Sequence, residues 1–199
     1  PGNRINDAKC DSQGRFWCGT IALDLTRGAG SLYRMDRDHS VHQVLSGLWV
    51  PNGLGWSMDN HTMYFIDSFT YGVDAFDFDE QRGEISNRRR FVDVPQEQGV
   101  CDGLTVDAEG GVWVAIFGGW VLNRYLPDGK LDLSIRLPVS QVTSAAFGGD
   151  DLCDLYITTA TNTATGTLSP EERQKQPLAG GIFYCRPGIQ GSPAQAWAG

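Results

Sequence analysis

The feature of this sequence that most constrains its fold is a strand–turn–strand unit that occurs four times. In the clearest copy, residues 100–115, Asp102-Gly103 opens an apolar alternating run and a turn over Asp107 to Gly110 leads into a second short strand. Consecutive copies begin 46, 50 and 41 residues apart, at Asn6, Asn52, Asp102 and Thr143. Self-similarity at roughly 40–50 residues is typical of a propeller or a similar repeat array.

Each copy is followed by two more segments that predict strands. They are Ser31–Met35 and Val41–Leu45, Val73–Phe78 and Arg90–Val94, Val121–Leu126 and Leu131–Ile135, and Gly181–Cys185 and Ala194–Trp197. Four antiparallel strands per repeat make a propeller blade. We therefore predict an all-β chain, a β-propeller with four blades of four antiparallel strands, as a single domain over residues 1–199. Either these blades close a ring by themselves or they belong to a larger propeller.

Two further features belong to this fold prediction. Residues 161–179 read as an insertion loop with a short helix that opens at Ser169, with Pro170 in its first position. Aromatic residues occupy similar places in the four repeats, and we expect them to pack between blades rather than to form a binding site. They are Trp17, Tyr64, Trp113 and Tyr156.

The first residues of the inner strands are the candidate site. Inner strands of a propeller stand around its axis, so Asn6, Asn52, Asp102 and Thr143 should converge at one mouth of the channel. Asn-Gly and Asp-Gly are also common turn pairs, so a plain turn is the alternative for any one copy. Oxygen ligands with one carboxylate suit a hard divalent cation such as Ca²⁺, Mg²⁺ or Mn²⁺, with water and another carboxylate completing the shell.

The net charge and the absence of several motifs exclude some classes of function. A net charge of −8 argues against nucleic acid or an anionic membrane as the main partner, and the basic run Arg88–Arg90 reads as a solvated outer strand. The sequence has no apolar run long enough for a transmembrane helix, no G-x-S-x-G elbow and no P-loop. Five scattered cysteines read as apolar core residues in a reducing compartment, which predicts a cytoplasmic protein. Because the chain starts at Pro1 and leads directly into an inner strand, we expect a further part to precede it.

Several strings, in order along the whole chain, resemble the SMP-30/gluconolactonase/LRE-like family. They are Arg4–Asp7, Gly30–Arg34, Val50–Leu54, Tyr64–Ser68, Cys101–Asp107, Thr143–Gly149, Leu155–Thr159 and the terminal Trp197–Gly199. The resemblance implies a six-bladed propeller with one divalent metal in its channel, so that four of six blades would be present here.

The resemblance also implies site residues. The Asn of the P-N-G motif and the Asp of the D-G-L motif, here Asn52 and Asp102, hold the metal together with a Glu that is absent from this sequence. Arg4 and Asn6 of the R-x-N-D motif contact the substrate. In the family a further acidic residue, shortly after a G-T-M motif, contacts the sugar. Here the motif reads Gly19-Thr20-Ile21, and Asp24 is the nearest match to that residue. Ala8 replaces the usual Gly of the N-D-G string.

We therefore expect a divalent-metal-dependent hydrolase of sugar lactones or related esters, with a small-molecule lactone as its partner. Ca²⁺ is the expected metal, and Zn²⁺, Mn²⁺ or Mg²⁺ are alternatives. Asp102 is the only carboxylate at the head of an inner strand, so it is the expected catalytic base. The alternatives are a non-catalytic calcium-binding or regulatory propeller, a luciferin-regenerating type of activity and, least favoured, a pure interaction propeller.

Overall fold

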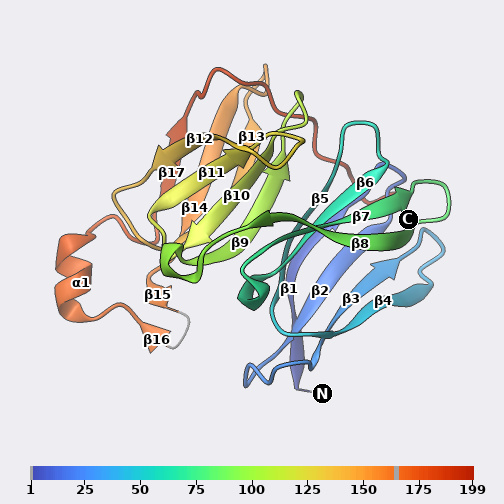
Figure 1. Cartoon of the computed structure of the whole chain (residues 1–199), viewed down its shortest axis with the longest axis horizontal. Coiled ribbons are helices and arrows are strands. Elements are labelled where there is room, and N and C mark those ends of the chain that lie inside the picture. Colours follow the sequence, from blue (N-terminus) through green and yellow to red (C-terminus); the bar gives the residue numbers. More distant parts are fainter. Residues whose placement is uncertain (1, 164–165) are drawn as a thin grey trace. The chain divides into compact units, whose positions relative to one another are not determined.

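The computed structural model describes residues 2–163 and 166–199, and almost all of its regular structure is β-strand (Figure 1). One compact unit contains the chain up to Asp93 together with Pro193–Gly199, and a second contains Val94–Ser192. Each unit holds two of the sheets that the repeats predict.

The first unit consists of two four-stranded antiparallel sheets, drawn from blue to green in Figure 1. In both sheets the strands lie side by side in chain order, as in a propeller blade. The first sheet contains β1 (Asn3–Cys10), β2 (Phe16–Ala22), β3 (Gly30–Met35) and β4 (Val41–Leu48). The second contains β5 (Pro51–Trp56), β6 (Thr62–Asp67), β7 (Gly72–Asp79) and β8 (Glu84–Asp93), with the 3-10 turn η1 (Ser68–Thr70) between β6 and β7.

The core of the first unit lies between these two sheets. Trp17 of β2 is fully buried and meets Trp56 and Phe78 edge-on, with ring centroids 5.9 and 6.0 Å away. Trp17 therefore packs between blades, as predicted. Other buried members of this core are Leu32, Leu48, Leu54, Met63, Phe65 and Phe76.

The second unit begins with the 3-10 turn η2 (Gln96–Gln98) and holds a four-stranded and a three-stranded sheet. The former contains β9 (Val100–Val106), β10 (Val112–Phe117), β11 (Val121–Tyr125) and β12 (Leu131–Arg136). The latter contains β13 (Val142–Gly148), β14 (Asp154–Thr159) and β17 (Ile182–Cys185). The short strands β15 (Asn162–Thr163) and β16 (Gly166–Thr167) pair with each other.

The core of the second unit repeats the arrangement of the first. Trp113 is fully buried and meets Phe147 of the next sheet edge-on at 5.9 Å. The predicted packing between blades is wrong for Tyr156, which is 42% exposed and contacts Tyr184 of its own sheet at 5.5 Å. Tyr64 is buried, and its ring contacts Phe91 of its own sheet at 4.8 Å. Tyr156 alternates with the buried Leu155 and Ile157, so it lies on the opposite face of the sheet.

The predicted turn between β9 and β10 is held by one buried carboxylate. Asp107 Oδ1 accepts the backbone N–H groups of Glu109 and Gly111, at 2.9 and 2.8 Å. Its Oδ2 accepts Trp113 Nε1 at 2.8 Å and Arg124 Nε at 2.7 Å. Hydrogen bonding to Asp107 raises the pKa of Arg124. Asp107 thus joins the turn to the buried indole of Trp113 and to the guanidinium of Arg124.

The turn between β1 and β2 has the same construction. Asp11 Oδ1 accepts the backbone N–H groups of Gln13 and Arg15, both at 3.0 Å, and its Oδ2 accepts Trp17 Nε1 at 2.9 Å. Here the guanidinium comes from Arg15, whose Nε lies 2.6 Å from Oδ2. The first and third repeats therefore share the contacts of this turn as well as the strand pattern.

The predicted fourth strand of the last sheet, Ala194–Trp197, is wrong. Residues 186–199 contain no strand, and only an isolated bridge between Gly191 and Asp107 occurs in this segment. Pro187 and Pro193 lack the N–H that a sheet ladder requires. Residues 193–199 belong to the first unit instead, where the Ala198 N–H donates to Gly14 O at 3.2 Å.

The predicted insertion contains the expected helix, α1 (Pro170–Lys175), drawn in orange in Figure 1. Ser169 is its N-cap, and a reciprocal hydrogen bond with Glu172 completes a capping box. Residues 164 and 165 of this predicted loop lie outside the described residues. Among the described residues, no helix is long and apolar enough to span a bilayer.

Candidate functional site

Every inner strand carries a β-bulge where the sequence predicts a site residue. Two residues of β1, β5 and β9 lie opposite a single residue of the neighbouring strand, and β13 has one extra residue opposite a continuous partner strand. Bulges interrupt the ladder and re-aim side chains, and they are frequent next to active sites. The bulged residues are Asn6-Asp7, Asn52-Gly53, Asp102-Gly103 and Thr143. The alternative interpretation of Asn-Gly and Asp-Gly as turns is therefore wrong, because both pairs lie inside strands.

Two predicted substrate residues are in direct contact in the first unit. Arg4 Nη1 donates to Asn6 Oδ1 at 2.9 Å, and Asn6 Nδ2 donates to Pro51 O at 2.9 Å. Gly19 permits this approach of the first two sheets, since a Cβ there would lie 2.4 Å from the Pro51 side chain. Arg4 is exposed and Asn6 is half-buried, so the pair has a fixed end in the protein and an end that faces solvent.

Asn52 is held at the end of β5 by the turn that follows β6. Its Nδ2 donates to Ser68 Oγ at 3.1 Å, which leaves the amide oxygen as the atom that can coordinate a cation. Asp67, which is buried, accepts the backbone N–H groups of Trp49 and Val50 at 3.0 and 2.7 Å. The donor chemistry at Asn52 therefore fits a hard divalent cation.

Asp102 belongs to the second unit and is half-buried in the bulge of β9. The following Gly103 lies against β13, because a Cβ there would be 2.3 Å from Ser144 Oγ and 2.8 Å from Thr143 O. Thr143 itself shares a hydrogen bond with Thr158, with 2.7 Å between the two hydroxyl oxygens. A carboxylate at this position supplies the charged oxygen that the predicted cation site needs.

Asp24 lies on the exposed loop between β2 and β3. Hydrogen bonds from the backbone and side chain of Thr26 lower the pKa of Asp24, so the carboxylate is ionised at neutral pH. An ionised carboxylate accepts hydrogen bonds, which suits it to bind the hydroxyl groups of a sugar.

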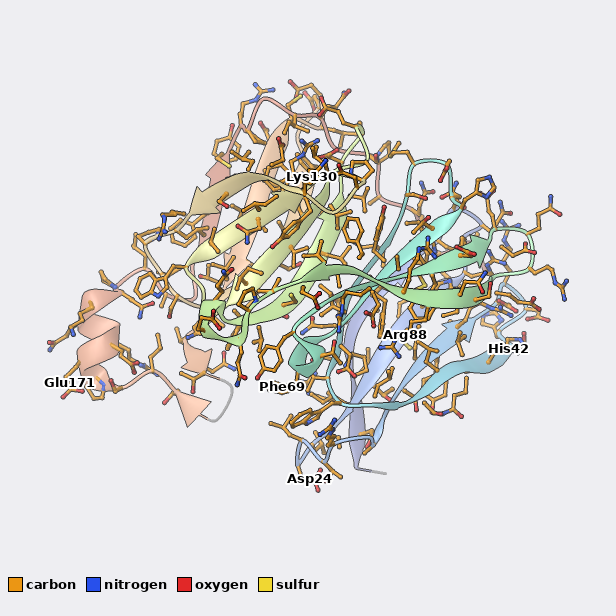
Figure 2. All side chains as sticks on the ribbon, in the orientation of Figure 1. Asp24, His42, Phe69, Arg88, Lys130 and Glu171 are labelled. Carbon is orange, nitrogen blue, oxygen red and sulfur yellow. The ribbon has the colours of Figure 1, made fainter. Side chains whose placement is uncertain are left out.

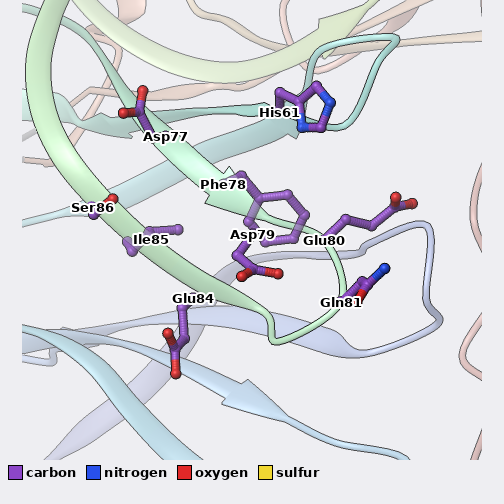
Figure 3. A pocket seen from close by; sticks show the side chains of 9 residues that line it. All are labelled: His61, Asp77, Phe78, Asp79, Glu80, Gln81, Glu84, Ile85 and Ser86. Atoms are coloured by element: carbon purple, nitrogen blue, oxygen red, sulfur yellow. The ribbon is translucent and has the colours of Figure 1, made fainter.

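A surface pocket of about 600 Å³ lies beside the β7–β8 hairpin of the first unit and includes none of the predicted site residues (Figure 3). Its lining includes His61, Asp77 and Glu80. Two of these are already engaged, because Asp77 accepts from Arg89 at 2.7 Å and Glu80 accepts from Ser12 at 2.6 Å. Among the described residues, no group of three or more His, Cys, Asp or Glu side chains is arranged to hold a metal.

The residues that support Asn52 do not stand out as site residues in the sequence. Asp67 and Ser68 are part of the family-like string Tyr64–Ser68, and an Asp-Ser pair directly after an apolar strand is a signal for capping chemistry. Nothing in the local sequence pattern connects Trp49 with the loop that carries Asp24, because their contact joins residues far apart in the chain.

Comparison with known proteins gives a consistent family match. The model of the "SMP-30/Gluconolactonase/LRE-like region" matches residues 1–161. Regucalcin from Oryctolagus cuniculus is 41% identical over 204 residues, which cover 99% of this chain and 67% of the rabbit protein. The chain thus spans about two thirds of the length of this relative.

Solved structures agree with this match. A luciferin-regenerating enzyme is 35% identical with a TM-score of 0.87, over 98% of this chain and 65% of that protein. Regucalcin from Agrobacterium tumefaciens, described as a calcium-binding protein, is 29% identical with a TM-score of 0.90, over 99% of this chain and 65% of that protein. These likenesses confirm the predicted fold class, an all-β chain of propeller blades.

Proposed function

Because the chain belongs to the SMP-30/gluconolactonase/LRE-like family, we propose that the protein is a divalent-metal-dependent hydrolase of sugar lactones. The observation that carries the proposal is the set of β-bulges in the inner strands. A bulge is retained where it orients a side chain, and these bulges contain Asn6, Asn52 and Asp102.

The proposed roles follow from the chemistry of each side chain. Asn52 and Asp102 would hold the metal, and the chemistry that a divalent cation would supply there is polarisation of the lactone carbonyl and charge stabilisation at its oxygen. Asp102 accepts a proton from the attacking water as the water oxygen bonds to the carbonyl carbon. The acyl C–O bond then breaks, and the same proton passes to the alkoxide of the opened ring.

In this proposal, residues of the first unit bind the substrate. Arg4 and Asn6, joined by their hydrogen bond, bind hydroxyl groups of the sugar, and the ionised Asp24 accepts hydrogen bonds from others. None of these three residues takes part in bond breaking. Their substitution should therefore act mainly on KM.

The experiment is a pH-stat assay of the full-length protein with a panel of sugar lactones, with and without chelator. Asp102→Ala at saturating metal should lower kcat by at least about 100-fold, because ligand and general base are lost together. Asn6→Ala should raise KM several-fold with little change in kcat. Asp128→Ala, which removes an exposed turn carboxylate of the same unit, is the matched control and should leave both constants unchanged.

Near wild-type kcat in Asp102→Ala would remove this residue from the mechanism. One alternative function has its own support, since the Agrobacterium relative is described as a calcium-binding protein. Tight Ca²⁺ binding in a calorimetric titration, without hydrolysis of any lactone in the panel, would favour this non-catalytic role. The likeness to a luciferin-regenerating enzyme supports a luciferin-regenerating type of activity as a further alternative.

A further inference from the structure

The loop that carries Asp24 has an unusual backbone. It joins β2 to β3 over residues 23–29, and Leu25 within it has a φ of 58°. A left-handed conformation is rare for a bulky residue that is not glycine, and it persists only where neighbouring contacts impose it. Leu25 is also 40% exposed, so burial of its own side chain does not account for the conformation.

The indole of Trp49 contacts this loop at two residues. Trp49 Nε1 donates to Leu25 O at 2.9 Å, and the guanidinium carbon of Arg27 lies 5.3 Å from the centre of the Trp49 ring. The hydrogen bond thus attaches Leu25 to the indole, and the cation–π contact attaches Arg27 to the same indole.

The indole itself is anchored on its other side. Its ring centroid lies 4.5 Å from that of Phe69 in η1, and Phe69 lies 6.5 Å from Tyr71. The backbone N–H of Trp49 is fixed separately by the buried Asp67. Figure 2 shows Asp24 and Phe69 at the same end of this unit. The indole therefore links the Asp24 loop to the turn η1.

We infer that Trp49 is a positioning residue: by binding Leu25 and Arg27 it fixes the loop so that Asp24 meets the hydroxyl groups of the substrate ring. The inference rests on the proposed function in so far as Asp24 contacts a sugar lactone. It predicts that replacing Trp49 raises KM for polyhydroxylated lactones and leaves KM unchanged for lactones without hydroxyl groups. The orientation of Asn52 does not depend on the indole, because Ser68 and Asp67 hold that segment through other atoms.

The kinetic test compares D-glucono-1,5-lactone with δ-valerolactone, which has the ester ring but no hydroxyl group. Trp49→Ala in the full-length protein should raise KM for gluconolactone about tenfold, as expected when a hydrogen bond to a charged group is weakened. The value of kcat and both constants for δ-valerolactone should stay within about twofold of wild type. Trp49→Phe, which keeps the ring stack but loses the N–H donor, should fall between Trp49→Ala and wild type.

Two controls separate positioning from general loss of structure. Trp197→Ala removes another half-buried indole of the same unit, one that contacts the ring of His39. This variant should leave KM and kcat unchanged for both lactones. Asp24→Ala and the double variant Trp49→Ala/Asp24→Ala should have the same KM for gluconolactone, because Trp49 acts through Asp24. Additive effects in this double-mutant cycle, or an equal change for both lactones, would overturn the inference while leaving the hydrolase intact.

Amide hydrogen exchange provides a test that does not depend on activity. Exchange over residues 23–29 should become faster in Trp49→Ala and stay at the wild-type rate in Trp197→Ala. If the wild type hydrolyses no lactone, the proposed function fails, and the exchange result alone decides whether Trp49 holds the loop. Unchanged protection of residues 23–29 in Trp49→Ala would show that it does not.

Discussion

At the scale of single residues, two glycines decide how closely neighbouring sheets approach beside the candidate site. Gly19 lies against Pro51 in the first unit, and Gly103 lies against Ser144 in the second. Gly19 faces the bulge of β1 across the ladder, and Gly103 is part of the bulge of β9. A side chain at either position would occupy space that the next sheet already fills, so the bulged side chains would shift with the backbone.

Gly103→Ala should therefore destabilise the protein by about 1–3 kcal/mol, the usual cost of overpacking a closely packed interface. The cause would be the new Cβ, which would lie 2.3 Å from Ser144 Oγ and 2.8 Å from the Thr143 carbonyl oxygen. Urea unfolding followed by circular dichroism gives the change in midpoint. Gly166→Ala is the control, because no atom lies within 4 Å of its added Cβ. Equal midpoints for the two variants would contradict the close approach of β9 and β13.

At the scale of elements, the first β-hairpins of two repeats share a turn in which one buried aspartate binds two backbone amides, an indole and a guanidinium. The aspartates are Asp11 and Asp107, and neither is accessible to solvent. Buried charges are stable only where they are paired and hydrogen-bonded, and each of these carboxylates has four donors. The turn thus ties the inner strand pair to the core tryptophan of its blade.

Asp107→Ala should reduce the free energy of unfolding by about 3 kcal/mol, because Trp113 Nε1 and the buried Arg124 both lose an acceptor. Arg124 keeps Asp132 and Glu109 as partners, which limits the loss. The measurement is a urea titration monitored by tryptophan fluorescence. Asp128→Ala, in the exposed β11–β12 turn, should change the free energy by less than about 0.5 kcal/mol. A similar small change for Asp107→Ala would mean that the network does not stabilise the blade.

At the scale of the whole molecule, the same small motif closes loops in both units. An exposed aspartate accepts the backbone N–H of the second residue after it, and hydrogen bonding lowers the pKa of each of these carboxyls. The five aspartates are Asp24, Asp38, Asp59, Asp128 and Asp151. Burial acts in the opposite direction at Asp7, whose pKa is raised.

Stability should therefore fall as the pH drops below about 4. A carboxyl whose pKa is lower in the folded state than its ordinary value of 3.8 is protonated first in the unfolded chain, so its contribution is present above that value and is lost as the pH falls through the folded pKa. Melting temperatures from pH 6 to pH 2.5 measure this dependence. Asp38→Asn, which keeps an acceptor in the turn but removes the titration, should flatten the curve. A melting temperature that is constant between pH 5 and pH 3 would contradict the prediction.

The sequence by itself determined the four sheets, their antiparallel order and the capped helix at Ser169. These features depend on local chemistry: alternation with period two, turn residues such as Asp107 to Gly110, and a Ser-Pro pair that opens a helix. It also marked the polar residues of the inner-strand bulges, because the repeat spacing selects Asn6, Asn52 and Asp102, although each strand begins one to three residues before them.

Only the tertiary structure decided the features that depend on residues distant in the chain. The last sheet has three strands because residues 193–199 pack with the first unit, where Ala198 bonds to Gly14. The bulges appear only when the register of both strands is known, and the Trp49–Leu25 hydrogen bond joins residues 24 positions apart. A local pattern cannot specify such contacts, because their free energy comes from surfaces that meet only after the sheets have formed.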